Sequence, residues 1–369
     1  MKRTLHWLFL GLVVAGAAGG AAALARLLLR PPGQPTEAER RAMIERVLDR
    51  DAGNIFCFDP DISYRLKPSF RGRRHDSRTL PHQTDSYGML GDREPETGAD
   101  HILLLGDSVV YGEYLPREDS FAARLEKEAP AGLQVLTGAC PGWSTHQEIG
   151  YWEKYLAGIS WRRAFIFFCL NDLLRFEWVW GGEDRFRISE EVAGLGGLLA
   201  AHCRSLKLRF LRGAFSDNPG LRPLAGLNNT CLVPFLKEWW DAYGEAVGPR
   251  LRGMNAAAPV TVVGLPAREQ LAALNAGGSR EEVMAPQERL RKFCRSLNVG
   301  YLDALPAFEE TGTGAYRIDC FLPGQEGELH LSREGHAALA AFLAPRVFAP
   351  VPEAPPELGP EENGEGAGR

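Results

Sequence analysis

From Ala99 onward the sequence alternates short apolar runs with segments of helical character, and this alternation constrains the fold more than any other feature. It predicts a parallel sheet whose strands are joined by crossover helices. Residues 173–230 interrupt the pattern and are interpreted as an insertion. The expected strands lie at residues 102–105, 133–137, 164–170, 259–264 and 299–303. The expected helices lie near residues 118–128, 146–157, 235–252 and 285–297, with a last helix after Ser332.

Four residues that could take part in catalysis lie at or near the ends of these elements. Ser108 follows the first strand in HILLLGDSVVYGEYL, and Gly142 follows the second in TGACPGWSTHQE. Asn171 ends the third in FIFFCLNDLL, and His330 precedes the last helix in GELHLSREGH. Taken singly, each has a structural explanation, as a turn residue, a helix cap or a buried histidine. Because ligands of open α/β sheets bind beyond the carboxyl ends of the strands, the four together indicate one site.

These residue types suit acyl transfer. A serine hydroxyl becomes a nucleophile when a neighbouring imidazole accepts its proton, which makes Ser108 and His330 the candidate pair. The Ser108 N–H, the Gly142 N–H and the Asn171 side-chain amide are the candidate donors of an oxyanion hole. We expect no metal and no cofactor, and the seven cysteines include no CxxC pair that would indicate zinc.

In these blocks the chain resembles the GDSL or SGNH hydrolases, a family named for a Ser, a Gly, an Asn and a His in separate blocks. The blocks LLLGDSVVYGEYL, CPGWST, CLND and HLSREGH agree with the family in order and spacing over about residues 99–346. The lead-in from FDPDISYRLKP to DSYGMLGDRE looks like the corresponding segment of membrane-anchored bacterial relatives. The resemblance implies a three-layer α/β/α fold with a central, mostly parallel, flavodoxin-like sheet, and a serine esterase.

The sequence departs from that family at two positions. Cys169 occupies the place where the asparagine block usually begins with glycine, which would narrow the room near the oxyanion. Gly327 occupies the place, three residues before His330, where the family commonly has the aspartate of a catalytic triad. The identity of the triad acid is therefore open.

We expect Glu328 to supply that carboxylate. It lies two residues before His330, and in an extended segment two such side chains share a face. Glu326 is a second option, and Asp319 would serve only if the chain folded back. If none of them reaches the imidazole, the site is a dyad of Ser108 and His330.

The N-terminus carries a separate signal. Lys2 and Arg3 precede a charge-free, apolar run at residues 4–25, which is long enough to span a bilayer. We interpret residues 1–30 as a signal anchor that forms an N-terminal transmembrane helix, with a cleaved signal peptide as the alternative. We expect the catalytic domain to be exported, to the periplasmic side in a bacterium, although arginines after the span leave the orientation open.

The remaining organisation follows from composition. Residues 31–98 are interpreted as a spacer helix and an irregular lead-in, residues 99–349 as the hydrolase domain, and residues 350–369 as a disordered acidic tail. A net charge of −5 gives no reason to expect nucleic acid as a partner. Cys203 and Cys231 could form a disulfide in an exported domain.

Three functions fit these observations. The first is an esterase whose substrate is a small-molecule or carbohydrate ester, for example an O-acetyl ester of cell-envelope carbohydrate or lipid. The second is an O-acyltransferase on polysaccharide that uses the same serine. The third is a catalytically inactive carbohydrate-binding relative, which the missing aspartate makes conceivable.

Overall fold

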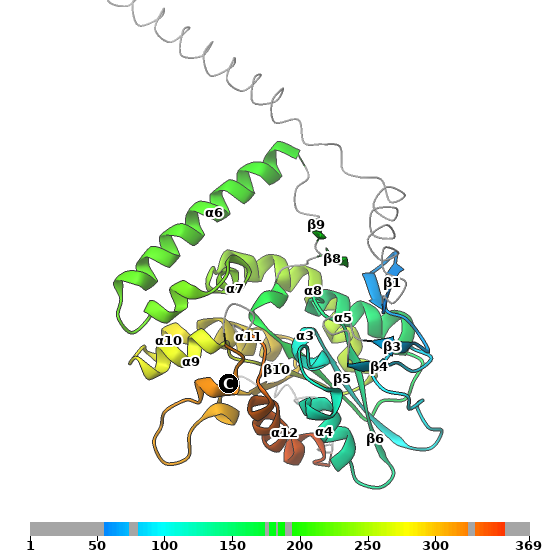
Figure 1. Ribbon diagram of the computed structural model, residues 1–369. Coiled ribbons are helices and arrows are strands. Elements are labelled where there is room, and N and C mark those ends of the chain that lie inside the picture. The colour runs from blue at the N-terminus through cyan, green and yellow to red at the C-terminus, as the bar shows by residue number, and fades with distance from the viewer. Residues whose placement is uncertain are drawn as a thin grey trace, which may run out of the picture.

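The computed structural model describes residues 55–73, 80–173, 177–181, 184–188, 194–323 and 329–350, with the backbone alone for those within 177–205. A five-stranded sheet forms its centre (Figure 1). Its strands are, in order across the sheet, β11 (Gly300–Asp303), β10 (Val260–Gly264), β7 (Arg163–Phe168), β5 (Asp100–Gly106) and β6 (Leu133–Ala139). All neighbouring strands of this sheet are parallel, so their carboxyl ends share one edge.

The apolar runs become strands because both faces of the sheet are covered. In β5 every residue after Asp100 is buried, and in β7 every residue after Arg163 is buried. Near-continuous apolar runs of this kind are typical of parallel strands between two helical layers. The register pairs Gly106, at the end of β5, with Ala139, at the end of β6, which brings the segments after these two strands side by side.

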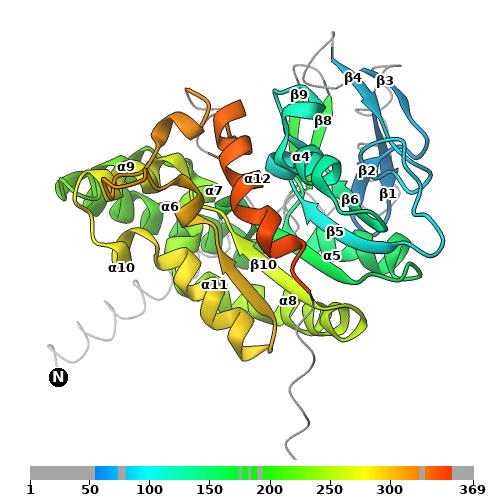
Figure 2. The same ribbon diagram turned by 90° about the horizontal axis from the view of Figure 1, so that it is seen from below.

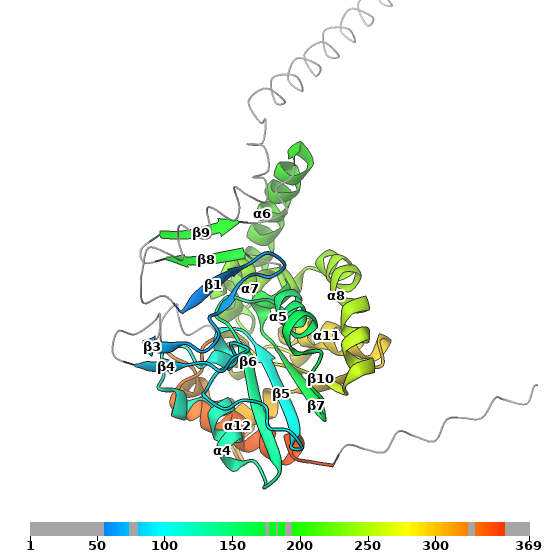
Figure 3. The same cartoon turned by 90° about the vertical axis from the view of Figure 1, so that its right-hand side faces the viewer.

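Helices cover both faces of the sheet, which confirms the predicted three-layer α/β/α fold. On one face lie α4 (Phe121–Glu128) and α12 (Arg333–Val347), in front of the strands in Figure 2. On the other lie α5 (Thr145–Tyr151), α8 (Glu238–Ala257) and α11 (Ala285–Ser296), as Figure 3 shows. The serine side chains at 120 and 332 cap α4 and α12 by accepting hydrogen bonds from the Ala123 and Gly335 N–H groups.

The lead-in is more regular than the sequence predicted. It contains two antiparallel hairpins, β1 (Phe56–Asp59) with β2 (Ser63–Leu66), and β3 (Arg71–Arg73) with β4 (Pro81–Gln83). The Asp59 carboxylate forms the turn of the first hairpin by accepting hydrogen bonds from the Asp61 and Ile62 N–H groups. An irregular lead-in was therefore the wrong prediction for these residues.

The insertion consists of a hairpin and a small helical lobe. The hairpin is β8 (Glu177–Gly181) with β9 (Asp184–Ile188), and the long helix α6 (Gly194–Asp217) stands out from the α/β body (Figure 1). Arg212 ties α6 to the lobe by donating to the backbone carbonyls of Ala225 and Leu227. The lobe continues with η4 (Arg222–Gly226), α7 (Asn229–Leu232) and η5 (Val233–Phe235). Further short elements include η1 (Arg117–Asp119), the π-helix η2 (Trp152–Leu156), α9 (Arg268–Asn275), α10 (Arg280–Val283), η6 (Leu305–Phe308) and η7 (Ile318–Cys320).

Several predictions concern segments outside the described residues. These are the apolar run at residues 4–25, the spacer helix that follows it, and the tail at residues 351–369. Among the described residues, no helix is both long and apolar enough to cross a membrane. The predicted disulfide involves Cys203, whose side chain also lies outside the described set.

Candidate active site

Strand β5 delivers Ser108 to the carboxyl edge of the sheet through a sharp turn. Asp107 caps the short helix α3 (Ser108–Tyr111), and its carboxylate accepts a hydrogen bond from the Val109 N–H at 2.9 Å. The turn is tight enough that a Cβ on Gly106 would come within 2.1 Å of the Val110 side chain. Ser108 is thus the first residue of a helix that begins directly at the strand end, and it is 7 % exposed.

His330 lies within hydrogen-bond distance of Ser108. The His330 Nε2 atom is 2.9 Å from the Ser108 Oγ atom, so the neutral imidazole with its proton on Nδ1 can accept the serine proton. The backbone of His330 is fixed because its carbonyl accepts from the Leu322 N–H, and because Leu331 forms a bridge with Phe321. The structure therefore brings together the predicted nucleophile and base, 222 residues apart in sequence.

Gly142 lies in the turn that follows β6. The Cys140 N–H donates to the Gly106 carbonyl, so this turn begins beside the end of β5. Gly142 has a φ of +77°, a conformation that favours glycine. Within the part of the chain that the structure describes, the N–H groups of Gly142 and Ser108 have no hydrogen-bond partner, so both can donate to an oxyanion.

Asn171 reaches the same place from the short helix η3 (Leu170–Leu173), which follows β7. Its side-chain Nδ2 atom donates to the Asp107 carboxylate at 3.2 Å. An amide nitrogen carries two hydrogens, so this bond orients the group and leaves one hydrogen for an oxyanion. The Cys169 thiol also lies close to Asp107, with its Sγ atom 3.6 Å from Oδ1, and its effect on the room near the oxyanion stays a prediction.

The Asp107 carboxylate links the nucleophile turn to Asn171. It is fully buried, and burial raises the pKa of its carboxyl group, while hydrogen bonds from the Val109 N–H and the Asn171 amide act to lower it. Because the same carboxylate contacts the cap of α3 and the Asn171 amide, it fixes the nucleophile relative to one oxyanion donor.

A further acid, Glu113, lies beside the base and was missed by sequence reasoning. Its Oε2 atom is 3.3 Å from the His330 Nε2 atom, and its side chain is only 4 % exposed. The turn after α3 places it there, because the Glu113 N–H donates to the Ser108 carbonyl. The available signal was an acid five residues after the nucleophile, inside an otherwise apolar stretch, whereas the acids predicted to assist His330 all lie close to it in sequence.

The structure describes only one of the acids that the sequence offered as partners of His330. Asp319 forms an ion pair with Arg317 at 3.0 Å, and its side chain is 66 % exposed, so it is not the acid of this site. Glu326, Gly327 and Glu328 lie outside the described residues. The role of Glu328 stays a prediction.

Comparisons with known proteins agree with this geometry. The model of the GDSL-like lipase/acylhydrolase family matches residues 104–338, which is more than half of the chain. No curated protein matches significantly. The chain belongs to the GDSL-like lipase/acylhydrolase family and is an ester-bond hydrolase.

Solved structures with a similar fold include two bacterial proteins. One is a member of the lipolytic protein G-D-S-L family from Veillonella parvula, with 13% identity and a TM-score of 0.36, covering 66% of this chain and 96% of its own. The other is a carbohydrate acetylesterase family member from Sinorhizobium meliloti, with 13% identity and a TM-score of 0.37, covering 67% of this chain and 97% of its own. At these values neither structure adds an argument beyond the family match.

Proposed function

We propose that the protein is a serine esterase that removes a small acyl group, such as acetyl, through an acyl-serine intermediate. The observation that carries this proposal is the 2.9 Å contact between the Ser108 Oγ and His330 Nε2 atoms at the carboxyl edge of the sheet. Nucleophilic catalysis by serine requires a base within hydrogen-bond distance of the hydroxyl.

The first half of the reaction forms the acyl-serine. The Ser108 oxygen attacks the ester carbonyl carbon while His330 Nε2 takes the hydroxyl proton. The carbonyl oxygen becomes an oxyanion, which the N–H groups of Ser108 and Gly142 and the free amide hydrogen of Asn171 stabilise. Loss of one such donor typically costs about 100- to 1000-fold in kcat. The C–O bond to the alcohol then breaks, and His330 gives its proton to the departing oxygen.

The second half releases the acid. His330 removes a proton from a water molecule, the water oxygen attacks the acyl carbon, and the bond to Ser108 breaks with return of the proton to serine. Both halves make His330 positive for part of the time. The Glu113 carboxyl, 3.3 Å from the same nitrogen, is placed to stabilise that charge when it is ionised.

The proposed substrate is an ester on cell-envelope carbohydrate or lipid, because residues 4–25 are expected to anchor the enzyme to the membrane. Retention in the membrane fraction after alkaline carbonate extraction would support this location. Release of a shortened soluble chain would argue for a cleaved signal peptide. An acyltransferase would move the acyl group to an added sugar, whereas the proposed esterase releases free acid.

The decisive test is hydrolysis of p-nitrophenyl acetate by the full chain and by Ser108→Ala. We expect the variant to lose at least 1000-fold in kcat, on the order of what loss of a triad member costs, and to keep the melting temperature of the wild type. His330→Ala should lose activity to a similar extent. A Ser108→Ala protein that kept most of its activity would rule out this function.

A further inference from the structure

The hairpin of β1 and β2 holds the turn that contains Gly142. The Tyr64 hydroxyl donates to the Pro141 carbonyl at 2.8 Å, and the Trp143 indole N–H donates back to the Tyr64 carbonyl at 2.9 Å. A third bond, from the Gln147 side-chain amide to the Ile62 carbonyl at 3.0 Å, joins the same hairpin to α5. All three bonds are buried, and each joins residues at least 77 positions apart in sequence.

The first of these bonds acts on the oxyanion donor through one peptide group. The Pro141 carbonyl and the Gly142 N–H belong to the same planar peptide unit, and no peptide bond among the described residues is cis. In a trans peptide the C=O and N–H vectors point in opposite directions. A hydroxyl that fixes the Pro141 oxygen therefore also fixes the direction in which the Gly142 N–H points.

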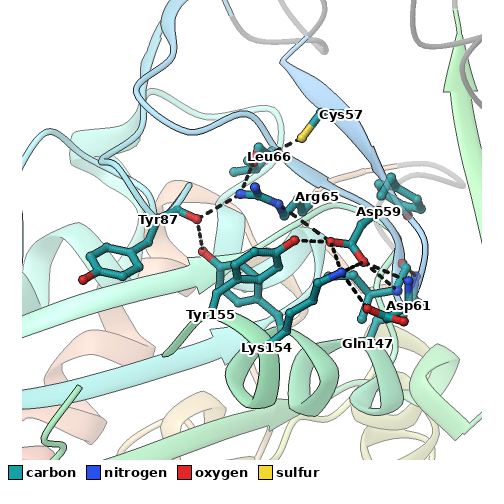
Figure 4. Close-up of polar contacts among 12 residues, drawn as sticks. Cys57, Asp59, Asp61, Arg65, Leu66, Tyr87, Gln147, Lys154 and Tyr155 are labelled. Atoms are coloured by element: carbon teal, nitrogen blue, oxygen red, sulfur yellow. Dashed lines mark hydrogen bonds and ion pairs between the residues drawn. The ribbon is translucent and has the colours of Figure 1, made fainter. Parts of the chain in front are cut away.

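The hairpin itself is firmly attached to the helix that follows this turn. Asp59, at the end of β1, is 1 % exposed and accepts hydrogen bonds from the Tyr155 hydroxyl and the Lys154 ammonium group of η2 (Figure 4). Arg65 lies over the Tyr155 ring, 4.2 Å from its centroid, and donates to the Tyr87 carbonyl. The hairpin that carries Tyr64 is thus held by several side-chain contacts, and the hairpin itself lies outside residues 104–338, the part matched by the family.

We propose, on the basis of the function proposed above, that Tyr64 is a positioning residue that aims the Gly142 N–H at the oxyanion. Gly142 cannot be aimed by its own side chain, and its N–H has no partner of its own among the described residues. The turn is closed by the hydrogen bond from the Trp143 N–H to the Cys140 carbonyl, and the hairpin adds a direct constraint on the Pro141 carbonyl. This chain therefore completes its oxyanion hole with an element that precedes the matched family domain.

The test compares Tyr64→Phe with a matched control, Tyr151→Phe. Tyr151 is equally buried, and its hydroxyl donates to a backbone carbonyl, that of Tyr87, at 2.9 Å, but it makes no hydrogen bond to the Gly142 turn. We expect Tyr64→Phe to lower kcat for p-nitrophenyl acetate about tenfold with KM within about twofold, because a misaimed donor weakens binding of the transition state more than that of the substrate. Tyr151→Phe should keep the kcat of the wild type.

The rate of reaction with a fluorophosphonate separates positioning from misfolding. The reagent forms a tetrahedral adduct at serine, so its rate should fall in Tyr64→Phe by the same factor as kcat, while the final stoichiometry stays at one label per chain. A wild-type rate in Tyr64→Phe, or an equal loss in Tyr151→Phe, would overturn the role of Tyr64. A reduced final stoichiometry at an unchanged rate would also overturn it. The lower activity of the variant would then come from a fraction of unfolded molecules and not from a misaimed donor. A wild-type chain that neither labels nor hydrolyses esters would refute the proposed function instead.

Discussion

The Nε2 atom of His330 lies close to both the Ser108 hydroxyl and the Glu113 carboxyl. Ser108 must give it a proton, and Glu113 lies close enough to stabilise the imidazolium that results. A buried charge pair at this distance interacts strongly, because little water screens it. Glu113 is therefore the described acid best placed to assist the base.

Replacement of Glu113 by Gln should show this assistance. The change keeps the shape of the side chain but removes its charge, so we expect kcat for p-nitrophenyl acetate to fall about tenfold, equivalent to about 1.4 kcal/mol in the barrier. Glu118→Gln, at an exposed acid in η1, is the control and should leave kcat unchanged. Equal activity of both variants would remove Glu113 from the mechanism.

The sequence-based prediction for the triad acid can be tested in the same assay. If Glu328 orients the imidazole from its other side, Glu328→Gln should lower kcat at least about tenfold, whereas Glu326→Gln should change it little. Full activity of Glu328→Gln combined with an inactive His330→Ala would replace the triad by a dyad of serine and histidine.

At the scale of elements, the site depends on the ends of β5, β6 and β7, which lead into α3, the Gly142 turn and η3, and on the segment before α12. The strands were predictable because their apolar runs are continuous, and buried parallel strands require such runs. Ser108, Gly142, Asn171 and His330 were found for the same reason, since each stands next to a recognisable element. Their positions follow from local sequence.

The elements that were missed depend on distant contacts. The strand pair β1 and β2 has only four residues in each strand and a turn built by the Asp59 side chain, and its burial against α5 cannot be deduced from its own sequence. Glu113 was missed similarly, because the turn that places its side chain beside His330 is not visible in the local periodicity. Sequence patterns report local periodicity, whereas these features come from tertiary packing.

Two serines at helix starts, Ser108 of α3 and Ser120 before α4, should have separate effects on catalysis and on stability. Ser120 caps α4, and its Oγ atom accepts a hydrogen bond from the Ala123 N–H at 3.2 Å. Loss of such a cap costs about 1 kcal/mol, so Ser120→Ala should unfold at a lower denaturant concentration while its kcat stays at the wild-type value. Thermal or urea unfolding combined with the ester assay checks both parts. A large loss of kcat in Ser120→Ala would show that the α4 start is coupled to the site.

At the scale of the whole molecule, three acids, Asp107, Glu148 and Asp172, are buried close to one another near the carboxyl edge of the sheet. Glu148 of α5 is fully buried, and its two carboxyl oxygens have no hydrogen-bond partner among the described residues. Burial, helped by the nearby Asp107, raises the pKa of Glu148 well above its usual value, so the folded protein holds this proton more tightly than the unfolded chain does. Burial and the neighbouring acids raise the pKa of Asp172 in the same way.

This burial makes stability depend on pH with a definite sign. The unfolded chain releases the Glu148 proton near pH 4.5, so the free energy of unfolding should fall as the pH rises from that value toward the raised pKa of the folded state. Glu148→Gln, a neutral side chain of the same shape, should therefore raise the melting temperature at pH 8 by about 2 °C or more and have little effect at pH 4. Glu245→Gln, at an exposed acid in α8, is the control. A lower melting temperature of Glu148→Gln at pH 8 would mean that the carboxylate is ionised and paired in the folded protein.

The most direct measurement of the central claim is the position of a fluorophosphonate adduct on the intact chain. The account predicts one label per chain, located by peptide mass spectrometry on the segment that contains Ser108, absent from Ser108→Ala and present in Ser120→Ala. It also predicts much slower labelling of His330→Ala, because the serine then lacks its base. No adduct on the folded wild-type protein, or an adduct on a different serine, would contradict the account.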